Sequence, residues 1–168
     1  ESPYSCEKII SLNPQSTTEA VESGVWVKGY LVGYYNNNTK QCMFQSAGAL
    51  GANILMSTNP AASTKEECIC IQLVNGSDVR KALNLIDNPG LLGAEIMVQG
   101  DVMKYNTFPG IKNTSEYSIL SQPVGPDQPD VPTGGDGTEA SPFAVGSIIA
   151  LAPSSTTEAV KDDVWVEG

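Results

Sequence analysis

The chain has no histidine among its 168 residues. This absence excludes histidine-dependent catalytic triads and zinc sites with histidine ligands within the chain. The four cysteines show no Cys-x-x-Cys spacing, and no apolar run approaches the length that spans a bilayer. We therefore expect no membrane-spanning segment. The first residues also lack the basic and apolar character of an export leader, so the localisation is inferred by other means.

Basic residues are scarce and unevenly placed. Nine Lys and Arg stand against 19 Asp and Glu, which gives a net charge of −10. Residues 1–123 hold 11 acids and 8 bases (−3), whereas residues 124–168 hold 8 acids and 1 base (−7). A protein that follows a nucleic-acid backbone normally presents a dense basic stripe. The composition therefore counts against nucleic-acid binding, although a local basic patch could still support it.

Residues 25–35 predict one long strand around which the fold is organised. The stretch is rich in β-branched and aromatic residues, and Gly29 and Gly33 fall where a long strand must coil sharply to serve two sheets. Similar patterns predict the other strands at residues 41–57, with a bulge or loop at 46–52, and at 68–74, 95–105 and 111–120. Helices capped by Ser5 and Ser77 are expected before the first strand and between the third and fourth. This order predicts a mainly β fold, a five-stranded OB-fold-like barrel.

The composition changes at residue 123. Residues 123–138 are rich in Pro, Gly and Asp, and proline recurs at every third position from Pro123 to Pro132. Such a segment is typical of a semi-rigid linker. We predict an OB-fold-like domain at residues 1–122, the linker at 123–138, and the truncated start of a second OB-fold-like repeat at 139–168.

The last segment repeats the beginning of the first. Between residues 3–29 and 142–168, 15 of the 27 aligned positions are identical, including Trp26 and Trp165. This density indicates duplication. The second copy holds only the counterparts of the first helix and the start of the first strand, so we expect the natural protein to continue beyond Gly168. We also expect residues 140–168 to contact another copy of the chain, because alone they would expose a large apolar surface.

Several of these segments together resemble a known family. They are residues 25–33, 53–55, 68–73, 79–85, the Asp-Asn-Pro-Gly of 87–90, and 109–112. In them the chain resembles, over roughly residues 3–120, an OB-fold-like domain of unknown function that is widespread in secreted and cell-surface proteins of Bacteroidetes. The resemblance implies a secreted, periplasmic or cell-surface protein, often modular, and it brings no catalytic residues.

An OB-fold barrel binds ligands on the outer face of its second and third strands and on the loops that join strands one to two and four to five. Those loops would be residues 36–41 and 106–110. The aromatic and basic residues that flank them are candidate ligand contacts: Tyr34, Tyr35, Lys40, Phe44, Lys104, Tyr105, Phe108 and Lys112. Exposed rings beside lysines could stack on bases or sugar rings. The alternative is that these rings close the ends of the barrel.

Three cysteines are candidates for a common cluster. Alternation places Cys68 and Cys70 on one face of their strand and Ile69 and Ile71 on the other, and a neighbouring strand could bring Cys42 close. A disulfide would suit an exported protein, and buried free thiols are the alternative. A metal site would lack a fourth ligand, so we expect none.

Trp26 is expected to lie in the core. It should face away from Val25 and Val27 and be covered by the helix that contains Cys6 and Ile9. Its replacement by alanine would then cost about 3 kcal/mol. A cost below about 1 kcal/mol would mark it as exposed and as a candidate for ligand stacking.

No catalytic constellation is visible, since the paired carboxylates at residues 66–67 and 162–163 are expected to be solvated. We expect a non-catalytic OB-fold binding or spacer module of an exported multi-domain protein, without a cofactor. Its unknown ligand could be an oligosaccharide, a peptide or single-stranded nucleic acid. Two alternatives are an accessory substrate-binding domain of an extracellular nuclease or other hydrolase, and a stand-alone nucleic-acid-binding protein.

Overall fold

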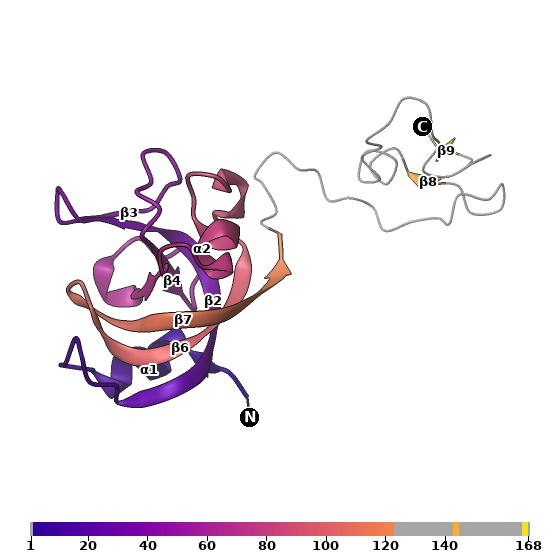
Figure 1. Cartoon of the computed structure of the whole chain (residues 1–168). Helices are drawn as coiled ribbons and strands as arrows, with labels where there is room; N and C mark the ends of the chain where they lie inside the picture. The colour runs from indigo at the N-terminus through magenta and orange to yellow at the C-terminus, as the bar shows by residue number, and fades with distance from the viewer. Residues whose placement is uncertain (1, 123–142, 145–165, 168) are drawn as a thin grey trace. The chain divides into compact units, whose positions relative to one another are not determined.

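A computed structural model describes residues 2–122, 143–144 and 166–167 of the chain (Figure 1). The chain divides into two units, residues 1–123 and 124–168, and each is considered separately. The elements of the first unit are, in chain order, β1 (Tyr4–Ser5), α1 (Cys6–Leu12), β2 (Glu22–Asn36), β3 (Gln41–Met43), β4 (Asn53–Ser57), the 3-10 helix η1 (Lys65–Glu67), β5 (Ile69–Gln72), α2 (Asp78–Leu83), the 3-10 helix η2 (Pro89–Leu91), β6 (Glu95–Tyr105) and β7 (Phe108–Ser121).

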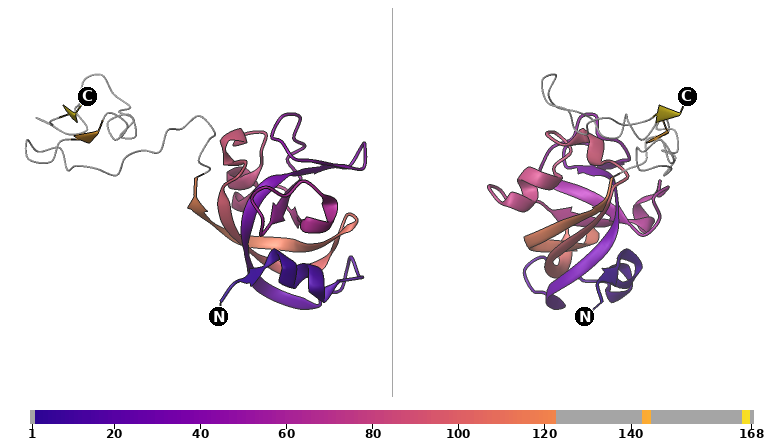
Figure 2. Two further views of the ribbon diagram at one scale, coloured as in Figure 1. Left: turned by 180° about the vertical axis from the view of Figure 1, so that it is seen from behind. Right: turned by 90° about the vertical axis from the view of Figure 1, so that its right-hand side faces the viewer.

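Five strands of the first unit close into a ring. β2 pairs with β4, β4 with β5, β5 with β7, β7 with β6, and β6 returns to β2. Every neighbour is antiparallel except the β5–β7 pair, which is parallel. The long curved strands β2, β6 and β7 wrap around the unit, as the two further views show (Figure 2). The prediction of a mainly β fold, with one helix before the ring and one between its third and fourth strands, is confirmed.

β2 pairs with four other strands, and β1 joins it at residues 27–28. β2 pairs with β6 over residues 22–30, with β4 over residues 30–33 and with β3 over residues 34–36. The register shifts before Gly33, which has φ +154°, and a Cβ there would collide with the backbone oxygen of Met43. Only glycine allows β3 to approach β2 so closely.

The predicted strand at residues 41–57 is in fact two strands. β3 pairs with β2 alone, whereas β4 belongs to the ring. The loop between them contains Gly48 and Gly51 at positive φ, which turns the chain instead of continuing the strand.

Aliphatic side chains from all five ring strands fill the interior. Fully buried examples are Ile54, Ile71 and Ile96, and α1 adds Cys6 and Ile9 to the same cluster. Burial of such side chains is the main source of stability in a small domain. The predicted division of β5 into two faces is confirmed, because its isoleucines belong to this interior cluster and its cysteine to a second one.

Trp26 is not part of this core, and the prediction that α1 covers it is wrong. Val27 is 0% exposed and lies in the interior cluster with Cys6 and Ile9, whereas Trp26 is only half-buried and belongs to neither cluster. The valines and the tryptophan do point to opposite sides of β2. The helix packs on the valine side, which leaves the indole on the outer face.

Two short strands of the second unit are described, β8 (Phe143–Ala144) and β9 (Val166–Glu167). They pair in parallel, with Phe143 opposite Val166. β1 and β2 pair in the same way, with Tyr4 opposite Val27. In the aligned repeat Tyr4 corresponds to Phe143 and Val27 to Val166, so the two units share this pairing. The linker and most of the predicted second repeat lie outside the described residues, and the contact of residues 140–168 with another copy stays a prediction.

Candidate functional site

The predicted ligand surface is largely a packing surface. Tyr34, Tyr35 and Phe108 are buried, with 2%, 4% and 1% of their surface exposed. The rings of Tyr35 and Phe108 meet edge to face, with centroids 5.2 Å apart. The hydroxyl of Tyr34 donates to the backbone oxygen of Ala47 (3.0 Å). These three rings are buried: Tyr34 belongs to the interior cluster, and Tyr35 and Phe108 belong to the second cluster.

The connection between β4 and β5 covers this surface. Its Ala62 packs with Tyr35, Leu55 and Phe108 in the second cluster, and the ammonium group of Lys65 lies 4.9 Å from the centre of the Phe108 ring. A cation over an aromatic face adds a modest attraction. The outer face that OB-fold proteins commonly use for ligands is therefore filled by the chain's own loop.

Glu67 holds this connection in place. Its carboxylate accepts hydrogen bonds from the hydroxyl of Thr64 (2.6 Å), the amide of Asn59 (3.2 Å) and the backbone N–H groups of Ser63 and Thr64 (3.2 and 3.1 Å). The bond from the Thr64 hydroxyl is the main reason that the pKa of Glu67 is lowered. The Thr-x-x-Glu spacing is a capping-box signal in the sequence that predicts a helical turn here.

The remaining predicted contacts are dispersed. Phe44 and Tyr105 are half-buried against the second cluster, and the Tyr105 hydroxyl donates to the backbone oxygen of Ala52 (3.4 Å). Lys112 donates to the backbone oxygen of Thr17 (2.6 Å). Of the other two lysines, Lys40 is exposed in the β2–β3 turn and Lys104 is half-buried on β6. The structure thus gathers four of the five predicted aromatic residues in the second cluster, but it does not gather the lysines around them.

The cysteines are free thiols, and the disulfide alternative is not realised. Cys42, Cys68 and Cys70 do gather in the second cluster, as the alternation of β5 predicts. Burial raises the pKa of Cys6, Cys68 and Cys70 to about 12. Within the described residues no group of three or more Cys, Asp or Glu is placed to hold a metal ion.

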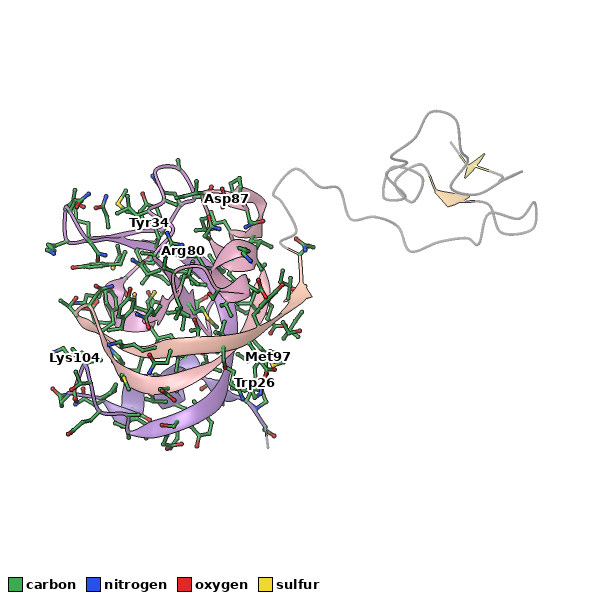
Figure 3. All side chains as sticks on the ribbon, viewed as in Figure 1. Trp26, Tyr34, Arg80, Asp87, Met97 and Lys104 are labelled. Carbon is green, nitrogen blue, oxygen red and sulfur yellow. The ribbon has the colours of Figure 1, made fainter. Side chains whose placement is uncertain are left out.

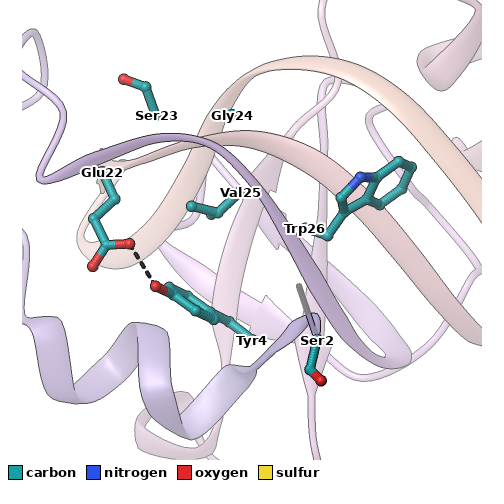
Figure 4. Close-up of a pocket in the computed structure, with 7 residues that line it drawn as sticks. All are labelled: Ser2, Tyr4, Glu22, Ser23, Gly24, Val25 and Trp26. Carbon is teal, nitrogen blue, oxygen red and sulfur yellow. Dashed lines mark hydrogen bonds between the residues drawn. The ribbon is translucent and has the colours of Figure 1, made fainter.

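A hollow of about 370 Å³ lies beside the start of β2 and was missed by the sequence reasoning. Its lining includes Ser2, Tyr4, Glu22, Gly24 and Trp26 (Figure 4). The phenol of Tyr4 donates a hydrogen bond to Oε2 of Glu22 (2.7 Å). The indole of Trp26 points away from this pair, across the strand. We call this hollow and the adjoining indole the Trp26 groove.

The polar groups of the Trp26 groove are positioned by the neighbouring strands. The backbone N–H of Gly24 donates to Asp101 (3.0 Å), and its oxygen accepts from the amide of Gln99 (3.2 Å). Asp101 also accepts from Asn113 (2.9 Å), and this bond is the main reason that the pKa of Asp101 is lowered. Glu22 makes no ion pair within the described residues. The hollow therefore offers a fixed carboxylate and hydroxyl groups, and the half-exposed indole adjoins it across the strand.

Residues 6–120 match the model of a protein family, a domain of unknown function named DUF6359. The chain belongs to this family. The DUF6359 match extends over the whole ring, from α1 to the end of β7. No curated protein and no solved structure shows significant similarity to the chain. The DUF6359 description assigns no activity, so the function is argued from the geometry.

Proposed function

We propose that the first unit is a non-catalytic, OB-fold-like binding module of an exported multi-domain protein, and that it binds an oligosaccharide in the Trp26 groove. The half-exposed Trp26 carries this proposal. A half-exposed indole on the outer face of a sheet is accessible to a ligand, and pyranose rings are suitable partners for an indole face.

The strand order supports the OB-fold part of the proposal. The ring runs β2, β4, β5, β7, β6, with a helix between its third and fourth strands in sequence. This order supports the proposal of a five-stranded Greek-key barrel of the OB type. The exported setting rests on the family resemblance of the sequence segments named above.

The chemistry of the groove favours a neutral, hydroxylated ligand. The carboxylate of Glu22 can accept hydrogen bonds from sugar hydroxyls, and the indole N–H of Trp26 has no partner within the described residues. A nucleic-acid backbone suits the groove poorly, because its ionisable lining residue Glu22 repels phosphate. The buried rings of Tyr35 and Phe108 are also closed to stacking bases.

A glycan array probed with the full chain tests the proposal. We expect selective binding to one class of neutral oligosaccharide, and loss of that binding in a Trp26→Ala variant. The matched control is Tyr117→Ala, because Tyr117 is also an exposed aromatic residue but lies on β7, outside the groove. Salt-sensitive anisotropy changes with single-stranded oligothymidylate, combined with an empty array, would instead support the nucleic-acid alternative.

A further inference from the structure

Two adjoining hollows lie beside α2. The first, of about 180 Å³, is lined among others by Gly51, Ser77, Arg80 and Asp87. It shares Ile86 with a second hollow of about 390 Å³, whose lining is mainly small and apolar. Neither hollow shares a lining residue with the Trp26 groove. They therefore form a separate surface, which we call the α2 cleft.

Arg80 brings an uncompensated charge to the α2 cleft. It is half-buried, and its guanidinium makes no hydrogen bond or ion pair with any described residue. Its backbone N–H donates to Ser77 Oγ (3.1 Å), which fixes the start of the helix and leaves the side chain free to project. Figure 3 marks Arg80 and Asp87 among the side chains of the unit. A partly desolvated guanidinium gains most from an oxyanion that can accept two of its N–H groups.

Glycine at position 51 lets the side chains of Ile86 and Arg80 approach the backbone closely. A Cβ built on Gly51 would lie 3.6 Å from Nη2 of Arg80 and 3.0 Å from Cδ1 of Ile86. Gly51 also has φ +65°, a backbone conformation that side chains disfavour. The guanidinium and the isoleucine therefore lie together against the backbone of Gly51, at the edge of the first hollow.

The other charges of the cleft define the kind of anion that fits. Lys81 is already paired with Asp78 (2.8 Å), and Asp87 accepts from the side-chain amide of Asn84 (3.0 Å). The negative charge of Asp87 disfavours a doubly charged phosphate beside it. A singly charged carboxylate on Arg80 is the better match.

Apolar groups continue the cleft away from the charge. Ile86 is 56% exposed and lines both hollows. A large exposed aliphatic side chain in the same hollow as an unpaired cation favours a ligand that combines a carboxylate with an aliphatic group.

We propose that the α2 cleft binds the C-terminal carboxylate of a peptide that ends in an aliphatic residue. Arg80 would hold the two carboxylate oxygens as a fork, and the last side chain of the peptide would cover Ile86. Binding at this cleft is independent of oligosaccharide binding in the Trp26 groove.

Fluorescence anisotropy with a labelled hexapeptide that ends in Ala-Leu tests this proposal on the full chain. We expect the free acid to bind at least about tenfold more tightly than the same peptide with a C-terminal amide, a difference of about 1.4 kcal/mol. Arg80→Gln should abolish the difference, whereas Lys40→Gln, which removes an exposed cation outside both hollows, should preserve it. Ile86→Glu should also abolish binding of the acid, because it places a negative charge at the rim without touching the core.

Two results would overturn the proposal. One is equal affinity for the acid and the amide, which would remove the role of the carboxylate. The other is binding of decanoate as tightly as the peptide, which would make the cleft a general carboxylate site. A Trp26→Ala variant should bind the peptide like the wild type, so the failure of one site can be told from the failure of the other.

Discussion

At the scale of single residues, Trp26 is the most informative position. The side chain is half-buried on the outer face of β2, so we expect Trp26→Ala to lower the free energy of unfolding by less than about 1 kcal/mol. Ile9→Ala, at a fully buried position of α1, should cost about 2–5 kcal/mol. Urea denaturation of both variants measures the difference. Equal losses of several kcal/mol would show that Trp26 is a core residue after all.

The wrong prediction that Trp26 lies under α1 shows the limit of the alternating pattern of side chains along a strand. The pattern around Val25 and Val27 correctly separates the two sides of the strand, but a tryptophan is as apolar as the valines opposite it. A period of two residues divides a strand into faces without saying which face the helix covers. The candidate contacts failed for a related reason, because Tyr35 and Phe108 could not be known to be buried before the β4–β5 connection was placed over them.

The pKa of Glu67 predicts an acid-sensitive contribution to stability. Because the folded-state pKa lies below the ordinary value of 4.5, this contribution is present above that value and is lost as the pH falls through the folded-state pKa. The difference in urea midpoint between wild type and Glu67→Gln should therefore shrink as the pH is lowered from 7 to about 3. Glu66→Gln is the matched control, because Glu66 accepts no hydrogen bond from a described residue. A Glu67→Gln difference that stays constant with pH would contradict the prediction.

The four cysteines should differ in reactivity. Cys42 is half-buried and the other three are buried, and burial raises the pKa of all four thiols. We expect Ellman's reagent at pH 8 to modify one thiol in the native chain and four in urea without reductant. A Cys42→Ser variant should be unreactive when native. A count of two in urea would reveal a disulfide and contradict the free thiols of this structure.

At the scale of elements, the closure of the ring depends on Gly110. A Cβ at this position would collide with the backbone oxygen of Cys70, across the parallel β5–β7 pair. Gly110→Ala should therefore cost at least about 2 kcal/mol, since the two strands must separate. Gly90→Ala is the matched control: nothing lies within 4 Å of its Cβ position, and we expect a change within about 1 kcal/mol. Urea unfolding of both variants measures the two changes in stability. Equal losses for Gly110→Ala and Gly90→Ala would mean that β5 and β7 are not in close contact.

Local signals predicted most elements, whereas packing between distant segments was out of reach. Ser5 and Ser77 accept the capping hydrogen bonds expected of them, from Lys8 (3.2 Å) and Arg80 (3.1 Å). The glycines of residues 25–35 also lie where β2 changes partners. The groove formed by Tyr4 and Glu22 could not be predicted from the sequence. The two residues are 18 positions apart, and a hydrogen bond over that separation produces no periodic sequence pattern. The fold was therefore more predictable than the site.

At the scale of the whole molecule, the two units share a strand pairing but differ in sequence at positions that line the Trp26 groove. The aligned repeat keeps Trp26 as Trp165, while Tyr4 is replaced by Phe143 and Glu22 by Lys161. Both partners of the hydrogen bond in the first groove change together. The residues that form the hydrogen bond in the Trp26 groove are therefore present only in the first of the two aligned repeats.

The central claim is that a ligand contacts Trp26 and leaves the cluster of Tyr35 and Phe108 closed. Intrinsic fluorescence of a Trp165→Phe variant of the full chain tests it most directly, because Trp26 is then the only tryptophan. Titration with cellohexaose, xylohexaose, mannohexaose and chitohexaose should give, for one of them, a saturable change in tryptophan emission whose midpoint equals the dissociation constant from calorimetry. Calorimetric binding of one of these hexasaccharides without any change in Trp26 emission would contradict the account.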